Sequence, residues 1–265
     1  MIQDGLVSVI LPYYNGQAFI KEALDSIRAQ TYKNFEVILV DDGSPDARQS
    51  DFLRELVAGY KDERLKYFHK PNGGLSNARN YAYERSSGSH LAFIDQDDLW
   101  APEKLERQMS VFRGNSAVEF IFTNGSSFGD ATPKFRRRKS IRDGIIRNSY
   151  CQMLRGNVVP ALTAMFTRSL VEKVGGSNPR YAVCPDYEYF LRMSEKTDFY
   201  FIDQPLAFYR IHGENTSRQT IRGGAEVLCI LSERKKVTAQ QKFWASYYYV
   251  KQLAFLLFDW IKHFG

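Results

Sequence analysis

Three carboxylates lie within four positions of the stretch "FIDQDDLW", residues 93–100. Asp95, Asp97 and Asp98 directly follow an apolar run that reads as a buried strand, so partial loss of water is expected around them. Like charges this close raise one another's pKa values unless a cation lies among them. Mg²⁺ and Mn²⁺ prefer oxygen ligands, often one or two carboxylates completed by phosphate and water. The pattern therefore predicts a metal site, with Asp95 and Asp97 on one side because alternate residues of a strand share a face.

The segments before this cluster alternate between the hydrophobic pattern of strands and that of helices. Short apolar runs of strand type are separated by segments of helical period, which is typical of an α/β protein with a mostly parallel central sheet flanked by helices. The expected strands are "VSVILP" (7–12), "FEVILV" (35–40), "LKYFH" (65–69) and "HLAFID" (90–95). The expected helices run through residues 20–27, 52–56 and 75–85. In open sheets of this kind ligands bind beyond the carboxyl ends of the strands, where the acidic cluster lies.

The rest of the chain is less regular. We expect a helix through 105–112, a strand in 117–128, a mobile basic loop at 132–144, a strand and short helix in 162–176, a helix beginning near Asp186, and a strand with a turn at its proline in 199–213. From about Ile221 the pattern is helical, with an apolar stripe of Phe243, Tyr247, Val250, Ala254, Leu257 and Ile261. We expect this stripe to pack on the preceding domain or on a second copy of the chain, with membrane contact as the lesser alternative.

Composition limits the class of protein. The chain has 265 residues, of which 44% are hydrophobic and 25% charged, which is typical of a folded globular protein. The net charge of +6 suits an anionic partner, which could be a nucleoside diphosphate, an acidic membrane face or nucleic acid, and charge alone does not choose among them. The cysteines are few and widely spaced, which favours a reducing compartment over a disulfide framework or a zinc site. We expect no signal peptide and no membrane span, and so a cytoplasmic protein with possible peripheral contact at the inner face of the membrane.

Four segments, in this order, resemble the family 2 glycosyltransferases of GT-A fold: residues 7–46, "NGGLSNARNYAYERSSGSHLAFIDQDDLW", "PDYEYFLRM" and "YRIHGENTS". The resemblance implies a catalytic domain over 1–217, with a nucleotide-binding half (1–100) and an acceptor-binding half (101–217), and a helical extension over 218–265. It implies metal-dependent, inverting transfer of a hexosyl or N-acetylhexosaminyl group from a nucleoside diphosphate sugar, a UDP-sugar by preference, to a glycan or lipid-linked glycan. Polysaccharide or lipopolysaccharide biosynthesis would be the setting, with no nucleic acid partner.

Two other classes of function compete with this one. A non-catalytic nucleotide-sugar or carbohydrate-binding protein could keep the fold, but it would not need a base carboxylate. A nucleotidyltransferase would show a glycine-rich phosphate loop near the N-terminus, and "LPYYNGQAF" is not one. The absence of G-x-G-x-x-G after the first strand argues against a dehydrogenase.

The resemblance assigns a donor site to three loops. Asp97 would be the first ligand of Mn²⁺ or Mg²⁺, with Asp95 nearer the ribose and sugar, and His212 close to the diphosphate or the metal. Asp41 and Asp42 are both candidates to accept a hydrogen bond from uracil. The remaining donor contacts are expected from Gln96, Gly73, Arg79, and the first-strand loop of Pro12, Tyr13, Tyr14 and Asn15. Asp98 fits a helix cap and a sugar contact equally well.

The family's catalytic base lies in an acidic pair that opens a helix, and "CPDYEYFLRM" is the matching stretch. Pro185 stands where the family commonly has Glu, so Asp186 is the expected base and Glu188 the alternative. Asp186 could instead be only a favourable charge in a first helical turn. The basic runs 136–139 and 234–236 are interpreted as solvated faces, with an acidic lipid or a lipid diphosphate as the alternative partner.

Overall fold

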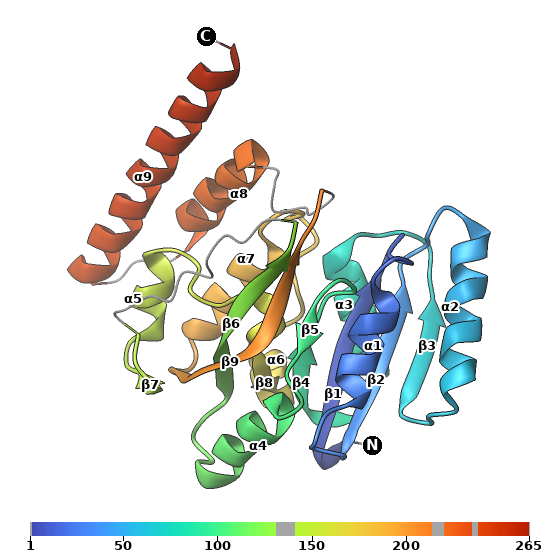
Figure 1. Ribbon diagram of the computed structural model, residues 1–265. Coiled ribbons are helices and arrows are strands. Elements are labelled where there is room, and N and C mark those ends of the chain that lie inside the picture. The colour runs from blue at the N-terminus through green and yellow to red at the C-terminus, as the bar shows by residue number, and fades with distance from the viewer. Residues whose placement is uncertain (1, 131–140, 214–219, 235–237, 265) are drawn as a thin grey trace.

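The computed structural model describes residues 2–130, 141–213, 220–234 and 238–264, which form a mixed β-sheet with helices on both faces (Figure 1). The strand order is β3-β2-β1-β4-β8-β6-β9-β5, and β7 pairs with β9 outside this path. The expected α/β class with a mostly parallel sheet and C-terminal helices is confirmed.

The first four strands are parallel, as the sequence predicts. They are β1 (Gln3–Tyr13), β2 (Phe35–Asp41), β3 (Leu65–His69) and β4 (Gly88–Phe93), connected through α1 (Ile20–Arg28), α2 (Ala47–Tyr60) and α3 (Leu75–Arg85). Every residue of β2 is buried, which explains its unbroken apolar run. Because β4 ends at Phe93, the acidic cluster begins immediately beyond the carboxyl end of a central strand.

The second half adds antiparallel strands. It contains β5 (Leu99–Trp100), α4 (Lys104–Gly114), β6 (Phe120–Gly129), β7 (Gly144–Ile146), α5 (Ser149–Leu154), η1 (Ala161–Thr163), β8 (Met165–Thr167), α6 (Arg168–Val174), α7 (Pro185–Ser194) and β9 (Phe199–Ile211). β8 is antiparallel to both β4 and β6. The sequence did not indicate β7, α5 or η1, which are too short to show a period.

The turn expected at Pro205 is wrong. β9 continues through Pro205 as one strand beside β6, and its register shifts on both sides of Asn124. Such a bulge accommodates a proline, which has no N–H for the strand ladder.

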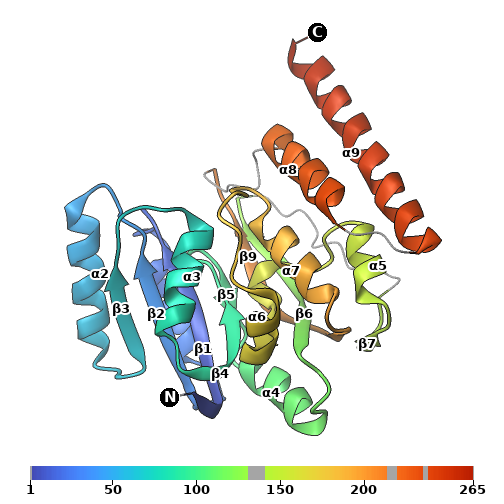
Figure 2. The same ribbon diagram turned by 180° about the vertical axis from the view of Figure 1, so that it is seen from behind.

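Two apolar layers enclose the sheet. α1, α2 and α4 cover one face, and α3, α5, α6, α7 and α8 cover the other (Figures 1 and 2). On the second face aromatic rings meet between β6, β8, α7 and β9, with Phe120 and Phe199 stacked at 3.9 Å between centroids. This layer also contains Val227, Ile230 and Leu231 of α8, so α8 shares a core with the sheet.

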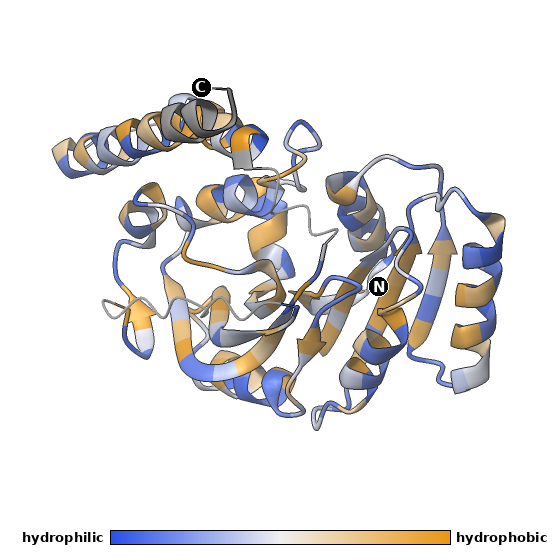
Figure 3. Ribbon diagram, turned by 45° about the horizontal axis from the view of Figure 1, so that its top comes forward, coloured by the Kyte–Doolittle hydropathy of each residue, from blue (hydrophilic) through white to orange (hydrophobic). Residues whose placement is uncertain are grey.

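The chain ends in α8 (Thr220–Glu233) and α9 (Ala239–Phe264), and α9 runs past α5 and away from the sheet (Figure 1). The stripe does not pack on the preceding domain: Phe243, Tyr247 and Val250 are 61%, 54% and 63% exposed. Packing on a second copy of the chain, or on a membrane, stays a prediction. A different face of α9, with Ala245 and Tyr248, packs on the domain, so apolar and polar residues both lie outward along the helix (Figure 3).

Parts of the predictions lie outside the described residues. These parts are the run 136–139, most of the expected loop at 132–144, residues 235 and 236, and the side chains of Leu257 and Ile261. Along the described ranges, no helix combines the length and the apolar character needed to cross a membrane.

Candidate active site

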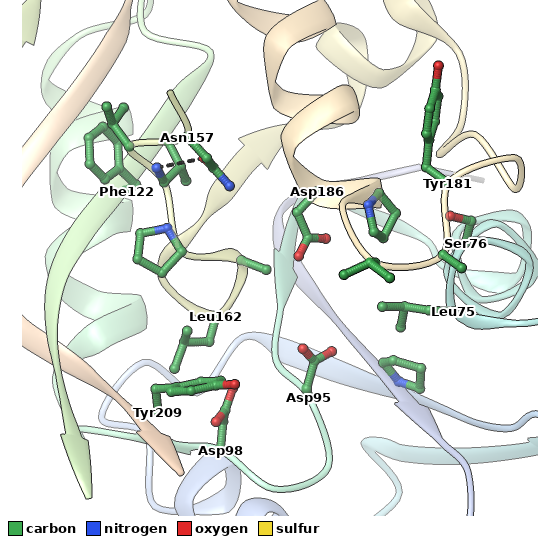
Figure 4. A pocket seen from close by; sticks show the side chains of 18 of the residues that line it. Leu75, Ser76, Asp95, Asp98, Phe122, Asn157, Leu162, Tyr181, Asp186 and Tyr209 are labelled. Carbon is green, nitrogen blue, oxygen red and sulfur yellow. Dashed lines mark hydrogen bonds between the residues drawn. The ribbon is translucent and has the colours of Figure 1, made fainter. Parts of the chain in front are cut away.

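A cavity of about 1710 Å³ opens at the carboxyl ends of the parallel strands. The loops after β1, β2 and β4 form one side, and α5, η1, the start of α7, α9, the first half of β6 and residues of β9 form the other. Asp95 and Asp186 project into it toward each other, from the β4 loop and from the first turn of α7 (Figure 4). Residues more than 90 positions apart in the sequence therefore meet in one site.

Asp97 and His212 form a pair at the floor of this cavity. His212 Nε2 lies 2.8 Å from Asp97 Oδ2, and both side chains are largely buried. Burial and the neighbouring Asp95 raise the pKa of Asp97, while His212 acts in the opposite direction. This contact brings His212 beside Asp97, the residue expected to be the first metal ligand.

Asp98 is held away from open solvent. It is 1% exposed, and its Oδ1 accepts a hydrogen bond from the Arg210 backbone N–H at 3.0 Å. Its Oδ2 is buried without a hydrogen-bond partner. Burial first, then Asp97 and Asp95, raise the pKa of Asp98 well above its usual range. A cation among these carboxylates would lower that cost.

The donor set suits an ion that is shared with a ligand. Within the described residues, no group of three or more His, Cys, Asp or Glu side chains is placed to hold a metal by itself. Asp97 and His212 supply two adjacent donors, and Asp98 has a buried oxygen without a partner. A divalent ion that takes its other ligands from diphosphate oxygens and water fits this arrangement.

The structure separates the two aspartates after β2. Asp41 is fully buried, accepts hydrogen bonds from Ser44 and Ser50, and does not line the cavity. Asp42 does line the cavity, and its carboxylate accepts the N–H groups of Gly73 and Gly74. Asp41 therefore stabilises the turn, and Asp42 joins two loops at the cavity wall.

The loop after β1 is tied to the acidic loop by Gln96. The Gln96 side chain accepts from Tyr14 N–H at 2.8 Å and donates to Tyr14 C=O at 2.9 Å. Pro12, Tyr13 and Asn15 line the cavity beside them. This pairing fixes the distance between the expected nucleoside and metal loops.

Arg79 is buried between two carboxylates. It is 2% exposed, donates to Asp95 Oδ1 at 2.9 Å, and forms a second, short ion pair with Asp186 Oδ1. Its guanidinium carbon lies 4.6 Å from the centre of the Phe93 ring. Burial raises the pKa of Asp186, and Arg79 opposes that rise. Arg79 contacts these carboxylates, and does not line the cavity where a base or a diphosphate would lie.

Asp186 and Glu188 have different surroundings. Asp186 lines the cavity, whereas Glu188 is 1% exposed and pairs with Arg192 Nε at 2.8 Å, outside the cavity. Of the two candidates, only Asp186 can reach a bound molecule in this arrangement.

Residues 8–175 match the family model "Glycosyl transferase family 2". The chain belongs to that family.

Curated relatives agree with the assignment. This glycosyltransferase is 30% identical over 218 residues to an uncharacterized glycosyltransferase of Rickettsia bellii, covering 81% of this chain and 31% of the relative. The chain spans about a third of the length of that relative and of those in Rickettsia felis and Rickettsia conorii. It is 28% identical over 253 residues to TuaG of Bacillus subtilis, provisionally assigned to teichuronic acid biosynthesis, covering 93% of this chain and 95% of TuaG.

Solved structures share the GT-A fold. TarS 1–349 of S. aureus in complex with UDP-GlcNAc superposes with a TM-score of 0.75 at 16% identity, covering 94% of this chain and 73% of that one. The mannosyltransferase PcManGT of Pyrobaculum calidifontis, in complex with GDP-Man and Mn²⁺, gives 0.69 at 20% identity, covering 98% and 76%. Because both structures are no more than 20% identical to this chain, the likeness is evidence for the fold alone.

Sequence reasoning missed two residues that shape the site of the glycosyltransferase. Arg210 donates to Asp97 C=O at 2.9 Å and to Glu22, so it holds the acidic loop. Its place at the end of a strand, two residues before His212, was the available signal. At Gly16 any Cβ would lie 2.1 Å from Gln96 Cδ, so a side chain there would break the Gln96 pairing.

Proposed function

We propose that this family 2 glycosyltransferase transfers a hexosyl or N-acetylhexosaminyl group, with inversion, from a UDP-sugar to a hydroxyl of a glycan or lipid-linked glycan. The observation that carries the proposal is the convergence of Asp97, His212 and Asp186 on one cavity. These residues come from three separate segments, and no packing requirement brings three such polar groups to one cavity wall. The name of the relative TuaG supports a polysaccharide acceptor.

Asp97 and His212 would hold Mn²⁺ or Mg²⁺ against the donor diphosphate. When bound, such an ion stabilises the negative charge that develops on the departing phosphate oxygen. The chain's own part is to orient the donor: Arg210 fixes the loop that carries Asp97, and Gln96 ties this loop to the nucleoside side of the cavity. Asp95, directed into the cavity and paired with Arg79, is placed to contact the ribose or sugar.

The nucleoside would lie against the loops after β1 and β2. Asp42 is a carboxylate acceptor in the cavity wall, and a carboxylate can accept the imide N–H of uracil. Tyr14, which is 47% exposed, offers a ring beside it for the base. The close approach of Gly43 to Asn72, where a Cβ would lie 2.5 Å from the Asn72 backbone nitrogen, brings the two loops together.

Asp186 would act as the base. A carboxylate on the face of the sugar opposite the diphosphate can take the proton of the acceptor hydroxyl as the oxygen attacks the anomeric carbon. Asp186 lines the cavity and points toward Asp95, which supports this placement (Figure 4). The competing function, a binding protein without turnover, has no use for a carboxylate there.

The first prediction tests the donor site. Asp97→Asn removes a charge next to the expected ion, so we expect UDP binding in Mn²⁺ to weaken by about 10-fold or more, since charge-assisted contacts of this kind are strong. Isothermal calorimetry with UDP, GDP and dTDP, with and without Mn²⁺, measures it. Asp51→Asn, on the exposed surface of α2, is the matched control. Unchanged metal-assisted UDP affinity in Asp97→Asn would refute the assignment, and equal binding of all three nucleotides would refute the preference for UDP.

A further inference from the structure

The cavity is larger than a donor site requires. Pockets for drug-sized ligands occupy about 300–1,000 Å³, and this cavity measures about 1710 Å³. Its part away from Asp42 and Asp97 is bordered by α5 and α9. We define the α5–α9 wall as the cavity-lining residues Gln152, Arg155, Phe243, Trp244, Tyr247 and Lys251.

Three residues of α9 form one face of this wall. Phe243, Tyr247 and Lys251 are spaced by four, so they lie above one another along the helix and line the cavity together. The rings of Phe243 and Tyr247 are exposed rather than packed in the core. Trp244 lies between them, 5.0 Å from Phe243 and 5.8 Å from Tyr247 between ring centres. Flat apolar rings of this kind can pack on the C–H face of a sugar ring.

The same wall carries two cations, Arg155 and Lys251, that form no ion pair with a carboxylate in the described part of the chain. The Arg155 guanidinium lies 4.0 Å from the Trp244 ring centre and donates to Gln152 Oε1 at 3.4 Å. Among the described residues, no carboxylate lies within ion-pair distance of Arg155 or of Lys251. The two glutamates of α8 have other partners: Glu233 pairs with Arg180, and Glu226 accepts backbone N–H groups. The wall therefore presents positive charge to the cavity.

The position of α9 relative to the proposed base is fixed by packing. Gly156 has a φ of +126°, and a Cβ there would lie 3.0 Å from the Tyr248 ring, so α9 lies directly on the turn after α5. Tyr248 also meets Tyr187 edge-on, and Tyr187 donates to Met153 C=O at 2.9 Å. Tyr187 is the residue after Asp186. The α5–α9 wall and the expected base are thus held by one packed cluster.

We propose that the α5–α9 wall binds the acceptor, and that the acceptor is an anionic glycan. This rests on the proposed function, because the acceptor must reach Asp186. A sugar ring packs on Phe243 and Tyr247, and a carboxylate or phosphate attached to the glycan pairs with Arg155 and Lys251. The continuity of the wall with the donor part of the cavity places the acceptor hydroxyl toward Asp186.

Binding to the full chain, with UDP and Mn²⁺ present, tests the proposal. The probes are a uronate-containing tetrasaccharide, a short-chain prenyl diphosphate-linked N-acetylglucosamine, and a neutral chitotetraose, each titrated by calorimetry. We expect at least one anionic probe to bind about tenfold or more tightly than the neutral one, and Arg155→Gln to remove this preference. Preference for the uronate identifies an acidic polysaccharide, and preference for the diphosphate identifies a lipid-linked acceptor.

Matched variants separate this wall from the rest of α9. Phe243→Ala/Tyr247→Ala and Lys251→Gln should weaken the preferred probe, while Tyr249→Ala and Lys242→Gln, exposed positions of the same helix outside the cavity, should not. UDP affinity is measured in every variant, so loss of the donor site is distinguished from loss of the acceptor site. Equal affinity for anionic and neutral probes, or wild-type binding in the wall variants, would overturn the proposal. If the full chain binds anionic vesicles and none of the glycan probes, the proposal is overturned as well.

Discussion

At the scale of single residues, Arg79 connects the carboxylates of Asp95 and Asp186, which point toward each other in the cavity wall. It pairs with Asp95 and Asp186 from a buried position on α3, and its Nε has no hydrogen-bond partner. A buried guanidinium is stable only with such partners, so it holds both carboxylates in place. The pair also opposes the rise that burial causes in the pKa of Asp186.

The second prediction concerns Asp186. Asp186→Asn keeps the size of the side chain and removes the proton acceptor, so we expect the transfer rate to fall about 10²- to 10⁴-fold, the usual contribution of a positioned base. UDP binding should remain, because Asp97, His212 and Asp42 are unchanged. Steady-state kinetics of transfer and calorimetry of UDP binding measure the two effects separately.

Glu188→Gln is the comparison for that variant. Glu188 is buried against Arg192, so its replacement should lower the melting temperature and leave turnover per folded molecule near normal. Near-normal turnover in Asp186→Asn together with an inactive Glu188→Gln would show that the base is Glu188.

At the scale of elements, α4 contains a lysine that is removed from water. Lys104 is fully buried, with its Nζ 2.8 Å from Gln108 Oε1 and 4.0 Å from the centre of the Trp100 ring. Burial lowers the pKa of Lys104 well below its ordinary value. The first turn of α4 therefore holds, against Trp100 of β5, an amine that loses its proton more easily than an ordinary lysine.

The third prediction follows from the protonation of Lys104. In the unfolded chain a lysine stays charged up to about pH 10.4, so the unfolded state binds the extra proton and the free energy of unfolding rises with pH. Across pH 7 to 9 this contributes at most about 1.4 kcal/mol per pH unit. Lys104→Met has no such ionisable group, so its free energy of unfolding does not gain this increase. The difference from wild type should therefore become more unfavourable for the variant as the pH rises, by at most about 1.4 kcal/mol per pH unit.

Urea unfolding of both proteins at several pH values measures the slope. The exposed Lys242→Met, on α9, is the control and should run parallel to wild type. Parallel curves for Lys104→Met and wild type would show that Lys104 is charged in the folded protein.

At the scale of the whole molecule, α8 supports the helix that carries the expected base. The Glu226 carboxylate of α8 accepts the backbone N–H groups of Ala182, Val183 and Cys184 at 3.0, 2.9 and 2.8 Å. These residues lead directly into α7 and Asp186. The predicted boundary at residue 217 stays a prediction, but α8 shares both a core and this contact with the domain before it.

The fourth prediction tests this support. Glu226→Gln replaces one acceptor oxygen by an NH₂ group, which leaves a backbone N–H unpaired and shifts the segment before Asp186. We expect kcat for transfer to fall about tenfold, in line with the loss from small misplacements of catalytic groups, with the KM for donor unchanged. The control is Glu233→Gln, another substitution on α8, which weakens the contacts of Glu233 with Arg180 and Tyr181. An unchanged kcat in Glu226→Gln would refute the supporting role.

Sequence alone determined the parallel half of the fold and the identity of the acidic residues. The runs at 7–12 and 35–40 are apolar because both faces of a parallel strand are buried, and this pattern is local. The strand end that positions Asp95 and Asp97 follows from the same local signal. The short β7 and α5 gave none, because three to six residues do not display a period.

The tertiary structure decided which neighbours each residue has. The sequence left Asp41 and Asp42 as equal candidates, and only the folded loops place Asp42 at the cavity and surround Asp41 with serines. The apolar stripe of α9 predicted a packed face, but Phe243 and Tyr247 line the cavity because Tyr248, on another face, fits against Gly156. Periodicity reports that a helix has an apolar side, whereas the direction of that side depends on the shape of segments far away in the chain.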